Sequence, residues 1–240
     1  MIKSQGGRTA LWVIGHLLWV FAILVGLQYL LGLLIVKIFP ANLLDSTLAN
    51  VLYLVVSYIL IVLVIIVLPP KIFKGKVEKV SREKLGLRGF PTWTDIGLAP
   101  IGYVVSLISA AGLTAFFRIF PWFNSEEAQN LGYSLYMMGW ERGLAFIGLA
   151  VFAPIIEELI FRGWLYGKLR IKIPKWLAII LVSLLFGLVH LQWNIGITVF
   201  CMSVISCILR EVTGTIYAGT LLHILSNGIA FYIRFVMGIG

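Results

Sequence analysis

Charged residues are scarce in this sequence. Only 12% of its 240 residues are Asp, Glu, Lys or Arg, whereas 60% are hydrophobic. A soluble domain carries about 25% charged residues, so this composition excludes an ordinary soluble domain and is typical of a protein that crosses a membrane several times. The formal net charge is nevertheless +9. The basic excess falls in short segments between apolar runs, which indicates membrane topology and argues against binding to nucleic acid.

Cysteine and aspartate are rare as well. The two cysteines, Cys201 and Cys207, lie within one apolar segment, at a spacing that puts them on different faces of a helix. This spacing disfavours both a disulfide framework and a thiolate metal site. The two aspartates, Asp45 and Asp95, lie near the ends of apolar segments, so no paired-aspartate site is available inside the membrane. A Gly-x-Ser-x-Gly nucleophile motif is also missing.

Long apolar runs make up most of the remaining chain. Seven segments have the length of membrane helices, which need about 20 residues to cross the hydrocarbon core. Their approximate limits are 10–37, 48–69, 95–118, 142–168, 176–192, 196–212 and 215–236. We therefore predict an all-α, polytopic transmembrane bundle of about seven spans, or eight if residues 120–140 add an interfacial helix. Residues 1–94 would form a transmembrane hairpin with a basic cytoplasmic loop, and residues 95–240 a transmembrane core.

The basic residues predict how the chain is oriented. Most of them lie before the first span, between the second and third, between the fourth and fifth, and before the seventh, whereas the opposite loops carry mainly Lys37, Arg118 and Arg142. Because positively charged loops stay in the cytoplasm, the segments rich in basic residues all fall on one side if the N-terminus is cytoplasmic. We expect an integral protein of the cell membrane in this orientation. The largest basic stretch, from Lys71 to Thr94, is interpreted as topological rather than as a specific lipid or partner site.

Polar side chains interrupt the apolar segments in three motifs. These are Glu157-Glu158-x-x-x-Arg162, Phe186-x-x-x-His190 and His223-x-x-x-Asn227. A charged residue in hydrocarbon costs at least about 2.5 to 3.5 kcal/mol on insertion scales, so such residues usually mark a functional site. Glu158 and Arg162 face the same way on a helix and can pair, whereas Glu157 is rotated by about 100°. One carboxylate can thus be structural while its neighbour is reactive.

The depth of these groups supports one shared site. Glu157 lies 17 residues before Pro174, and His190 lies 16 residues after it. At about 1.5 Å per residue, the two side chains reach nearly the same level on antiparallel helices. Glu157 can then act as a general base on a water held by His190. His223 and Asn227 can donate hydrogen bonds to a developing oxyanion, which completes the equipment for peptide hydrolysis.

A metal is the alternative for the same residues. Two histidines and one carboxylate form a common zinc ligand set, so Glu157, His190 and His223 would be the ligands if zinc were bound. The helical His-Glu-x-x-His zinc signature is absent from the sequence, however. No cofactor is firmly implied, and we favour a reaction of glutamate and water without an obligatory metal.

The three motifs, in this order, resemble those of the CPBP family, which comprises type II CAAX prenyl endopeptidases together with bacteriocin-processing and abortive-infection-like membrane proteins. The resemblance covers roughly residues 85–235 and rests on the segments 154–163, 186–190 and 223–227. It implies that residues 95–240 form a helical catalytic core in which Glu157 activates water with help from His190. It also implies an oxyanion hole formed by His223 and Asn227. The supporting residues would be Glu158, Arg162 and Phe186.

We therefore predict an intramembrane endopeptidase that cleaves a membrane-associated peptide or protein, for which a prenylated CAAX-type tail is one candidate. Two other interpretations stay open. The chain could be a non-catalytic immunity or scaffold protein whose polar cluster holds the helices together, or a proton-coupled transporter, since intramembrane Glu and His also form proton relays. The expected partners are the lipid bilayer and the substrate, with no nucleic acid, and no oligomeric state is predicted.

Overall fold

The computed structural model describes residues 2–40, 46–69, 80–127, 129 and 132–239, with the backbone alone for residues 2–5. Of the described residues, 79% are helical, and none of them lies in a strand. Six helices in these ranges are long and apolar enough to cross a membrane, namely Gly6–Ile38, Thr47–Val67, Trp93–Phe117, Gly139–Lys172, Trp193–Thr213 and Tyr217–Val236. The remaining predicted span corresponds to a shorter apolar helix, Lys175–Leu188. The predicted all-α polytopic bundle is thereby confirmed.

Several helices contain π-helical turns, in which backbone hydrogen bonds join residue i to residue i+5. The N-terminal rod consists of α1 (Ile2–Phe21), η1 (Ala22–Leu27) and α2 (Gln28–Ile38), and the second helix of α4 (Thr47–Val62) and η2 (Leu63–Val67). The longest central rod consists of α7 (Gly139–Phe146), η3 (Ile147–Phe152), α8 (Ala153–Glu158), η4 (Leu159–Tyr166) and α9 (Gly167–Lys172). The others are α6 (Trp93–Phe117), α10 (Lys175–Leu188), α11 (Trp193–Thr213), α12 (Tyr217–Phe231) and η5 (Tyr232–Val236).

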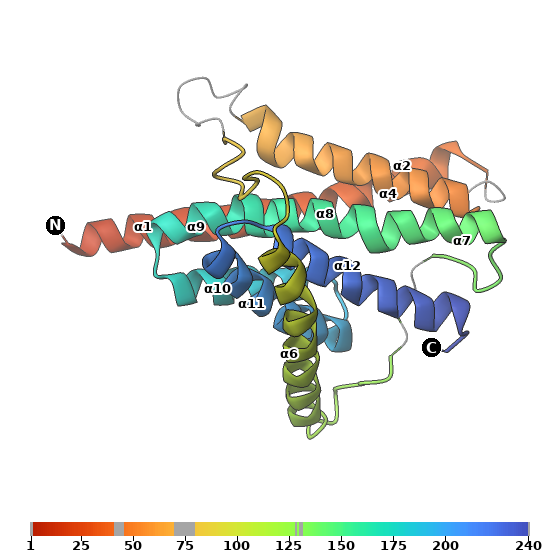
Figure 1. Cartoon of the computed structure of the whole chain (residues 1–240). Coiled ribbons are helices and arrows are strands. Elements are labelled where there is room, and N and C mark those ends of the chain that lie inside the picture. The colour runs from red at the N-terminus through yellow and green to blue at the C-terminus, as the bar shows by residue number, and fades with distance from the viewer. Residues whose placement is uncertain (1, 41–45, 70–79, 128, 130–131, 240) are drawn as a thin grey trace.

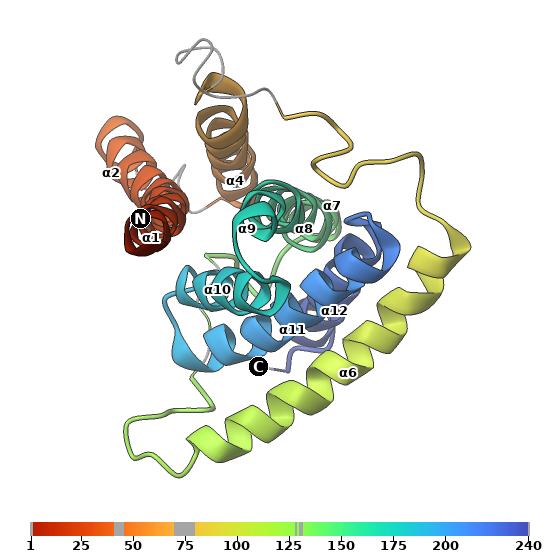
Figure 2. The same cartoon turned by 90° about the vertical axis from the view of Figure 1, so that its left-hand side faces the viewer.

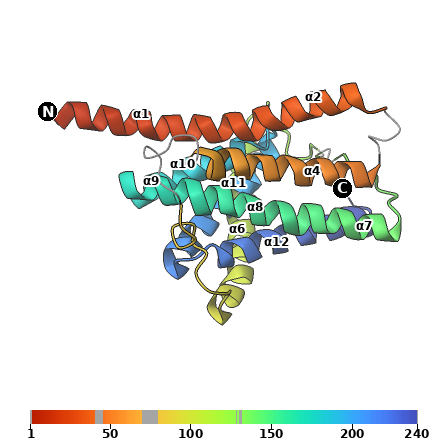
Figure 3. The same ribbon diagram turned by 90° about the horizontal axis from the view of Figure 1, so that it is seen from above.

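The central rod lies in the middle of the bundle. Figure 1 and Figure 3 show the rods of α1–α2, α4 and α7–α9 running side by side, with α12 along the other side of the central rod. Figure 2 shows α6 beside α11 and α12, on the side away from α1 and α2. The main apolar core forms where the central rod meets α10, α11 and α12, and Phe161, Phe186 and Leu222 are fully buried there. The polar motifs therefore project into the centre of the bundle.

Helices α10 and α11 approach each other closely at a pair of glycines. A Cβ added to Gly187 would lie 2.8 Å from the carbonyl oxygen of Gly196, and one added to Gly196 would lie 3.0 Å from that of Gly187. Small residues allow this kind of backbone contact between membrane helices. Ser203 donates a buried hydrogen bond of 2.9 Å to Ser183 between the same helices. The tight crossing fixes the turn after α10, which carries His190.

The segment before α6 is tied to the junction of α11 and α12. Thr92 and Asp95 form a capping box at the start of α6, and the Asp95 carboxylate also accepts a hydrogen bond of 3.1 Å from the Thr215 hydroxyl. The Ile216 amide donates to the carbonyl of Gly86, 3.1 Å away. Residues 71–79 of the predicted basic loop lie outside the described residues. Between α6 and α7, the described residues form turns and irregular backbone, so they do not contain the interfacial helix considered above.

Candidate active site

The helix that carries the first motif changes its hydrogen-bond pattern on both sides of Glu157 and Glu158. The π-helical turns η3 precede α8, and the π-helical turns η4 follow it. Pro154 lies in the first turn of α8. Such π-helical turns inside α-helices are rare and occur frequently at functional sites. They also leave particular backbone groups without the partner that a regular α-helix would supply.

Asn227 satisfies one of these backbone groups. The amide of Ala153 donates to the carbonyl of Gly148 in the π pattern, so the next amide in line for the Leu149 carbonyl is that of residue 154. That residue is proline, which has no N–H. The side-chain Nδ2 of Asn227 donates to the Leu149 carbonyl instead, at 3.1 Å. This bond attaches α12 to the central rod just before the Glu-Glu pair.

Glu158 and Arg162 form a buried ion pair. Nη1 of Arg162 lies 3.0 Å from Oε1 of Glu158, and both side chains are 0% exposed. The same carboxylate oxygen accepts a hydrogen bond of 3.2 Å from Nδ1 of His223. The guanidinium of Arg162 also stacks over the ring of Phe186, with its Cζ 4.5 Å from the ring centroid. A buried charge is tolerated when it is paired in this way, so Glu158 and Arg162 have a clear structural role.

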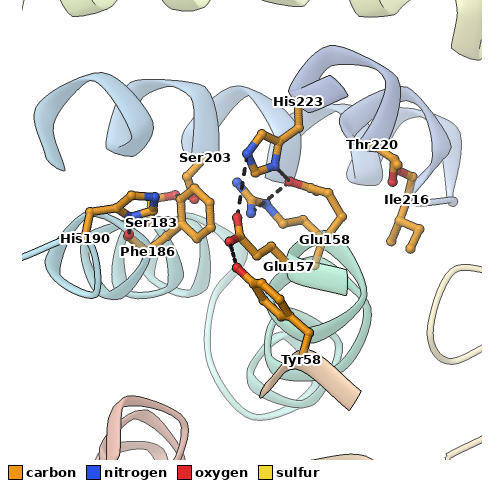
Figure 4. Close-up of polar contacts among 11 residues, drawn as sticks. Tyr58, Glu157, Glu158, Ser183, Phe186, His190, Ser203, Ile216, Thr220 and His223 are labelled. Carbon is orange, nitrogen blue, oxygen red and sulfur yellow. Dashed lines mark hydrogen bonds and ion pairs between the residues drawn. The ribbon is translucent and has the colours of Figure 1, made fainter. Parts of the chain in front are cut away.

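Glu157 makes a different set of contacts. Its Oε1 accepts a hydrogen bond from the hydroxyl of Tyr58, and its Oε2 lies 3.7 Å from Nε2 of His223 (Figure 4). The side chain of Glu157 is 15% exposed, whereas that of Glu158 is fully buried. His223 therefore lies between two carboxylates and presents one ring nitrogen to each. Of the two carboxylates, only Glu157 is accessible to a reactant.

His190 is connected to His223 by the ring of Phe186, which contacts both histidines. Its Nδ1 lies 2.8 Å from the carbonyl oxygen of Phe186. Because a carbonyl oxygen only accepts, Nδ1 carries the hydrogen, and Nε2 of the neutral ring is left as an acceptor. The Phe186 ring makes edge-on contacts with both histidines, with centroid distances of 5.1 Å to His190 and 5.7 Å to His223. Figure 4 shows this ring between His190 and the contact of Glu157 with His223.

The predicted site residues thus fall into two groups. Those joined by direct contacts are Glu157, Glu158, Arg162, Phe186, His190 and His223. Asn227 lies one helical turn after His223, and its side-chain amide is bonded to the central rod rather than to any of these residues. The catalytic roles assigned to the individual residues stay predictions.

The same residues fit zinc poorly in this arrangement. Zinc ligands have to approach one ion to about 2.0–2.2 Å. Nowhere in the described part of the chain do three His, Cys, Asp or Glu side chains form a group that could hold a metal ion. The zinc ligands considered above were Glu157, His190 and His223. The Phe186 ring stands between the two histidines. We therefore derive no step through a metal.

The fold and these contacts can be compared with known proteins. Residues 139–229 match the family model described as type II CAAX prenyl endopeptidase Rce1-like, and this range contains all three motifs. We refer to this segment as the Rce1-like domain, after the family model that it matches. The family resemblance noted from the motifs is thereby confirmed.

One curated protein that is similar to the chain is the UPF0177 protein YbdI of Lactococcus lactis subsp. lactis (strain IL1403). It is 34% identical over 101 residues, which are 41% of this chain and 52% of the relative. The chain thus spans about half the length of the curated relative that it matches. No solved structure matches the chain.

Tyr58 is the site residue that the sequence did not indicate. It lies in α4, outside the Rce1-like domain, yet its hydroxyl contacts the carboxylate of Glu157 inside that domain. A single tyrosine in an apolar span carries no spacing signal and resembles an ordinary interface or packing residue. The contact also bears on the predicted division at residue 94, because the N-terminal hairpin supplies part of the site. The division itself stays a prediction.

Proposed function

We propose that this integral membrane protein is an endopeptidase that cleaves a membrane-associated peptide or protein with a water molecule activated by Glu157. The observation that carries the proposal is the contact between an accessible carboxylate and an imidazole inside an Rce1-like domain, where Glu157 Oε2 lies 3.7 Å from His223 Nε2. The two atoms are too far apart for a direct hydrogen bond, and a water molecule beside them can contact both.

Glu157 would act first as a general base and then as a general acid. The water oxygen attacks the carbonyl carbon of the substrate while a water proton passes to the free Oε2 of Glu157. The tetrahedral intermediate then collapses, the C–N bond breaks, and Glu157 returns the proton to the leaving amine. The products are a carboxylic acid and an amine, which become a carboxylate and an ammonium ion by proton transfer, and the carboxylate of Glu157 is regenerated. Tyr58 keeps the other oxygen of Glu157 occupied and so directs Oε2 towards the reactants.

The two histidines and Asn227 would complete the reaction. Nε2 of His190 is a hydrogen-bond acceptor and can orient the water. Nδ1 of His223 already donates to Glu158, so donation from Nε2 to the oxyanion requires the imidazolium form, which carries hydrogen on both nitrogens. The amide of Asn227 has two hydrogens, of which Leu149 takes one. The second is available to an oxyanion, and one such donor contributes about 10² to 10³ in rate.

The substrate side of the proposal is supported by an apolar cavity beside the turn that carries His190. The cavity has a volume of about 530 Å³ and lies between α6, α10 and α11. Gly187, Leu188 and Leu191, which flank His190 in the sequence, line it. A cavity of this size and polarity can accept the apolar chain of a lipidated substrate. We therefore include prenylated CAAX-type peptides among the candidate substrates.

The membrane and orientation are also part of the proposal. We place the protein in the cell membrane with the N-terminus in the cytoplasm. Supporting this, basic residues of the described loop and of α9 line one cavity, and α9 lies towards the end of the bundle where the N-terminus lies (Figure 1). A substrate tail reaching the site from this side would be a cytoplasmic one.

The experiment is cleavage of a panel of lipidated and unlipidated peptides by the purified protein in lipid nanodiscs, with products identified by mass spectrometry. We expect the wild type to cleave at least one peptide and Glu157→Gln to cleave none. For the apolar cavity, Leu188→Trp should slow cleavage of a lipidated peptide more than Leu177→Trp. Leu177 is a comparably exposed residue of α10 that does not line the cavity.

A scaffold function is the second candidate, and the buried contacts of Glu158 with Arg162 and His223 favour it. Those contacts hold the central rod and α12 together whether or not the protein is an enzyme. Glu157 distinguishes the enzyme from the scaffold, because a scaffold does not need an accessible carboxylate beside His223. A wild-type protein that leaves the whole panel intact, while variants of Glu158 unfold, would favour the scaffold.

A further inference from the structure

A second cavity, with a volume of about 430 Å³, lies at the end of the bundle where the segment before α6, α9 and the last turn of α11 meet. Six basic and two acidic side chains line it. The basic ones are Lys84, Arg88, Lys168, Arg170, Lys172 and Arg210, and the acidic ones are Glu83 and Glu211. The lining therefore carries four more positive than negative charges. The residues come from three segments far apart in the sequence.

Some of these charges are already engaged within the protein. Arg170 pairs with Glu211 at 3.2 Å. Arg210 donates to the carbonyl oxygens of Gly163, at 3.0 Å, and of Lys84, at 2.8 Å. The first contact neutralises Glu211. The bonds of Arg210 leave its positive charge uncompensated, because a carbonyl carries no net charge.

Two exposed cations of the lining have no internal partner of opposite charge. Arg88, in the segment before α6, and Lys172, at the end of α9, form no ion pair with any residue in the described ranges. They approach the cavity from different segments. Their charges are therefore available to an external anion.

The cavity also has rigid and aromatic walls. A Cβ on Gly167 would lie 3.1 Å from Nη2 of Arg210 and 3.2 Å from the carbonyl oxygen of Lys84, so a glycine here lets α9 approach both groups closely. Trp12 and Trp164 form part of the lining. Tryptophan is enriched where membrane proteins meet the lipid headgroups. This places the cavity at the level of the headgroups rather than in the hydrocarbon core.

We propose that this cavity is a binding site for a phosphate group, presented by an anionic phospholipid headgroup or as a free anion. Basic pockets between membrane helices bind phospholipid headgroups, and arginine matches phosphate oxygens with two parallel N–H donors. The positive-inside rule explains why these residues lie on one side, but it does not require three distant segments to converge around one cavity. The site is independent of the proposed peptidase activity.

The first measurement uses the wild-type protein and compares the two sources of phosphate. Native mass spectrometry would follow binding of phosphatidylglycerol, phosphatidylcholine and inorganic phosphate to the protein in detergent micelles. We expect phosphatidylglycerol to bind at least about tenfold more tightly than phosphatidylcholine. Binding of the lipid without competition by millimolar phosphate assigns the site to a headgroup, and competition assigns it to phosphate in general. Equal binding of the two lipids together with no phosphate binding overturns the proposal.

A pair of double variants separates a built site from diffuse attraction. Arg88→Gln with Lys172→Gln removes two cations of the cavity, while Arg82→Gln with Lys175→Gln removes two exposed cations that do not line it. Each basic residue near a charged headgroup contributes enough that losing two should weaken phosphatidylglycerol binding about 30-fold. The control pair should change it less than about threefold. Similar losses in both double variants would mean that only the overall charge matters, and the proposed site would be wrong.

Discussion

The Tyr58 hydroxyl donates a hydrogen bond to the carboxylate of Glu157, although 99 residues separate the two in the sequence. Tyr58 is only 8% exposed, and its ring packs edge-on against Phe152, with a centroid distance of 6.3 Å. The N-terminal hairpin therefore holds one oxygen of a carboxylate that belongs to the Rce1-like domain. We regard Tyr58 as a positioning residue for the proposed general base.

Tyr58→Phe tests this positioning role. A hydrogen bond to a charged group contributes about 1.5–3 kcal/mol, so we expect kcat for peptide cleavage to fall about tenfold to hundredfold. KM should change little, because Tyr58 is not proposed to bind substrate. The control is Tyr53→Phe, which removes another hydroxyl of α4 that donates to the Gln28 carbonyl. Equal losses of kcat in both variants would contradict the specific role of Tyr58.

Glu158→Ala tests the structural role of the second carboxylate. The substitution leaves Arg162 buried without its ionic partner and removes the acceptor for Nδ1 of His223. We expect a destabilisation of about 3–5 kcal/mol, seen as a lower unfolding temperature in detergent. Glu211→Ala is the matched control, because it breaks the more exposed pair with Arg170 and should cost no more than about 1 kcal/mol. Comparable unfolding temperatures for the two variants would refute a buried, stabilising pair.

Asn227→Ala tests whether Asn227 has more than a structural role. Loss of the bond to the Leu149 carbonyl should cost about 0.5–1.5 kcal/mol of stability. If the second amide hydrogen binds the oxyanion, kcat should also fall by about 10² to 10³. Both quantities can be measured on one preparation, by thermal unfolding and by steady-state cleavage. A stability loss with kcat unchanged within threefold would restrict Asn227 to attaching α12 to the central rod.

Gly187→Ala tests the crossing of α10 and α11 that fixes the turn with His190. The new Cβ would lie 2.8 Å from the Gly196 carbonyl oxygen, so the two backbones have to separate. We expect a loss of about 1–3 kcal/mol and lower activity, measured by thermal unfolding and peptide cleavage. Gly112→Ala in α6 is the control, because a Cβ there meets nothing within 4 Å. A variant at Gly187 as stable and active as the one at Gly112 would show that the close crossing is dispensable.

Hydropathy and motif spacing were sufficient to predict the helices and the pairing of Glu158 with Arg162 in the candidate site. The seven apolar segments all form helices, because the length of an apolar run is set by the membrane that it crosses. The pairing of Glu158 with Arg162 follows from their spacing of four residues, which survives even though Arg162 lies in the π-helical turns of η4. These features depend on short-range patterns that are visible in the sequence.

The remaining features depend on contacts between distant segments. No local pattern marks Tyr58, because its importance comes only from the packing of α4 against α8. The bond of Asn227 to the Leu149 carbonyl has a partial signal in the sequence, since Pro154 necessarily leaves a helix carbonyl without its amide partner. The sequence does not show which carbonyl lacks a backbone donor, because that depends on the π-helical turns before the proline. The insertion of the Phe186 ring between the two histidines likewise follows from how three helices pack together.

The most direct test of the account is the rate of peptide cleavage by Glu157→Gln compared with wild type, for a substrate identified in the panel. The substitution keeps the size of the side chain and can still accept a hydrogen bond from Tyr58, but the amide cannot accept the proton of the attacking water. We predict an unchanged unfolding temperature and a cleavage rate lower by at least about 10² to 10⁴. A folded Glu157→Gln protein that cleaves the peptide at more than about a tenth of the wild-type rate would contradict the assignment of Glu157 as the general base.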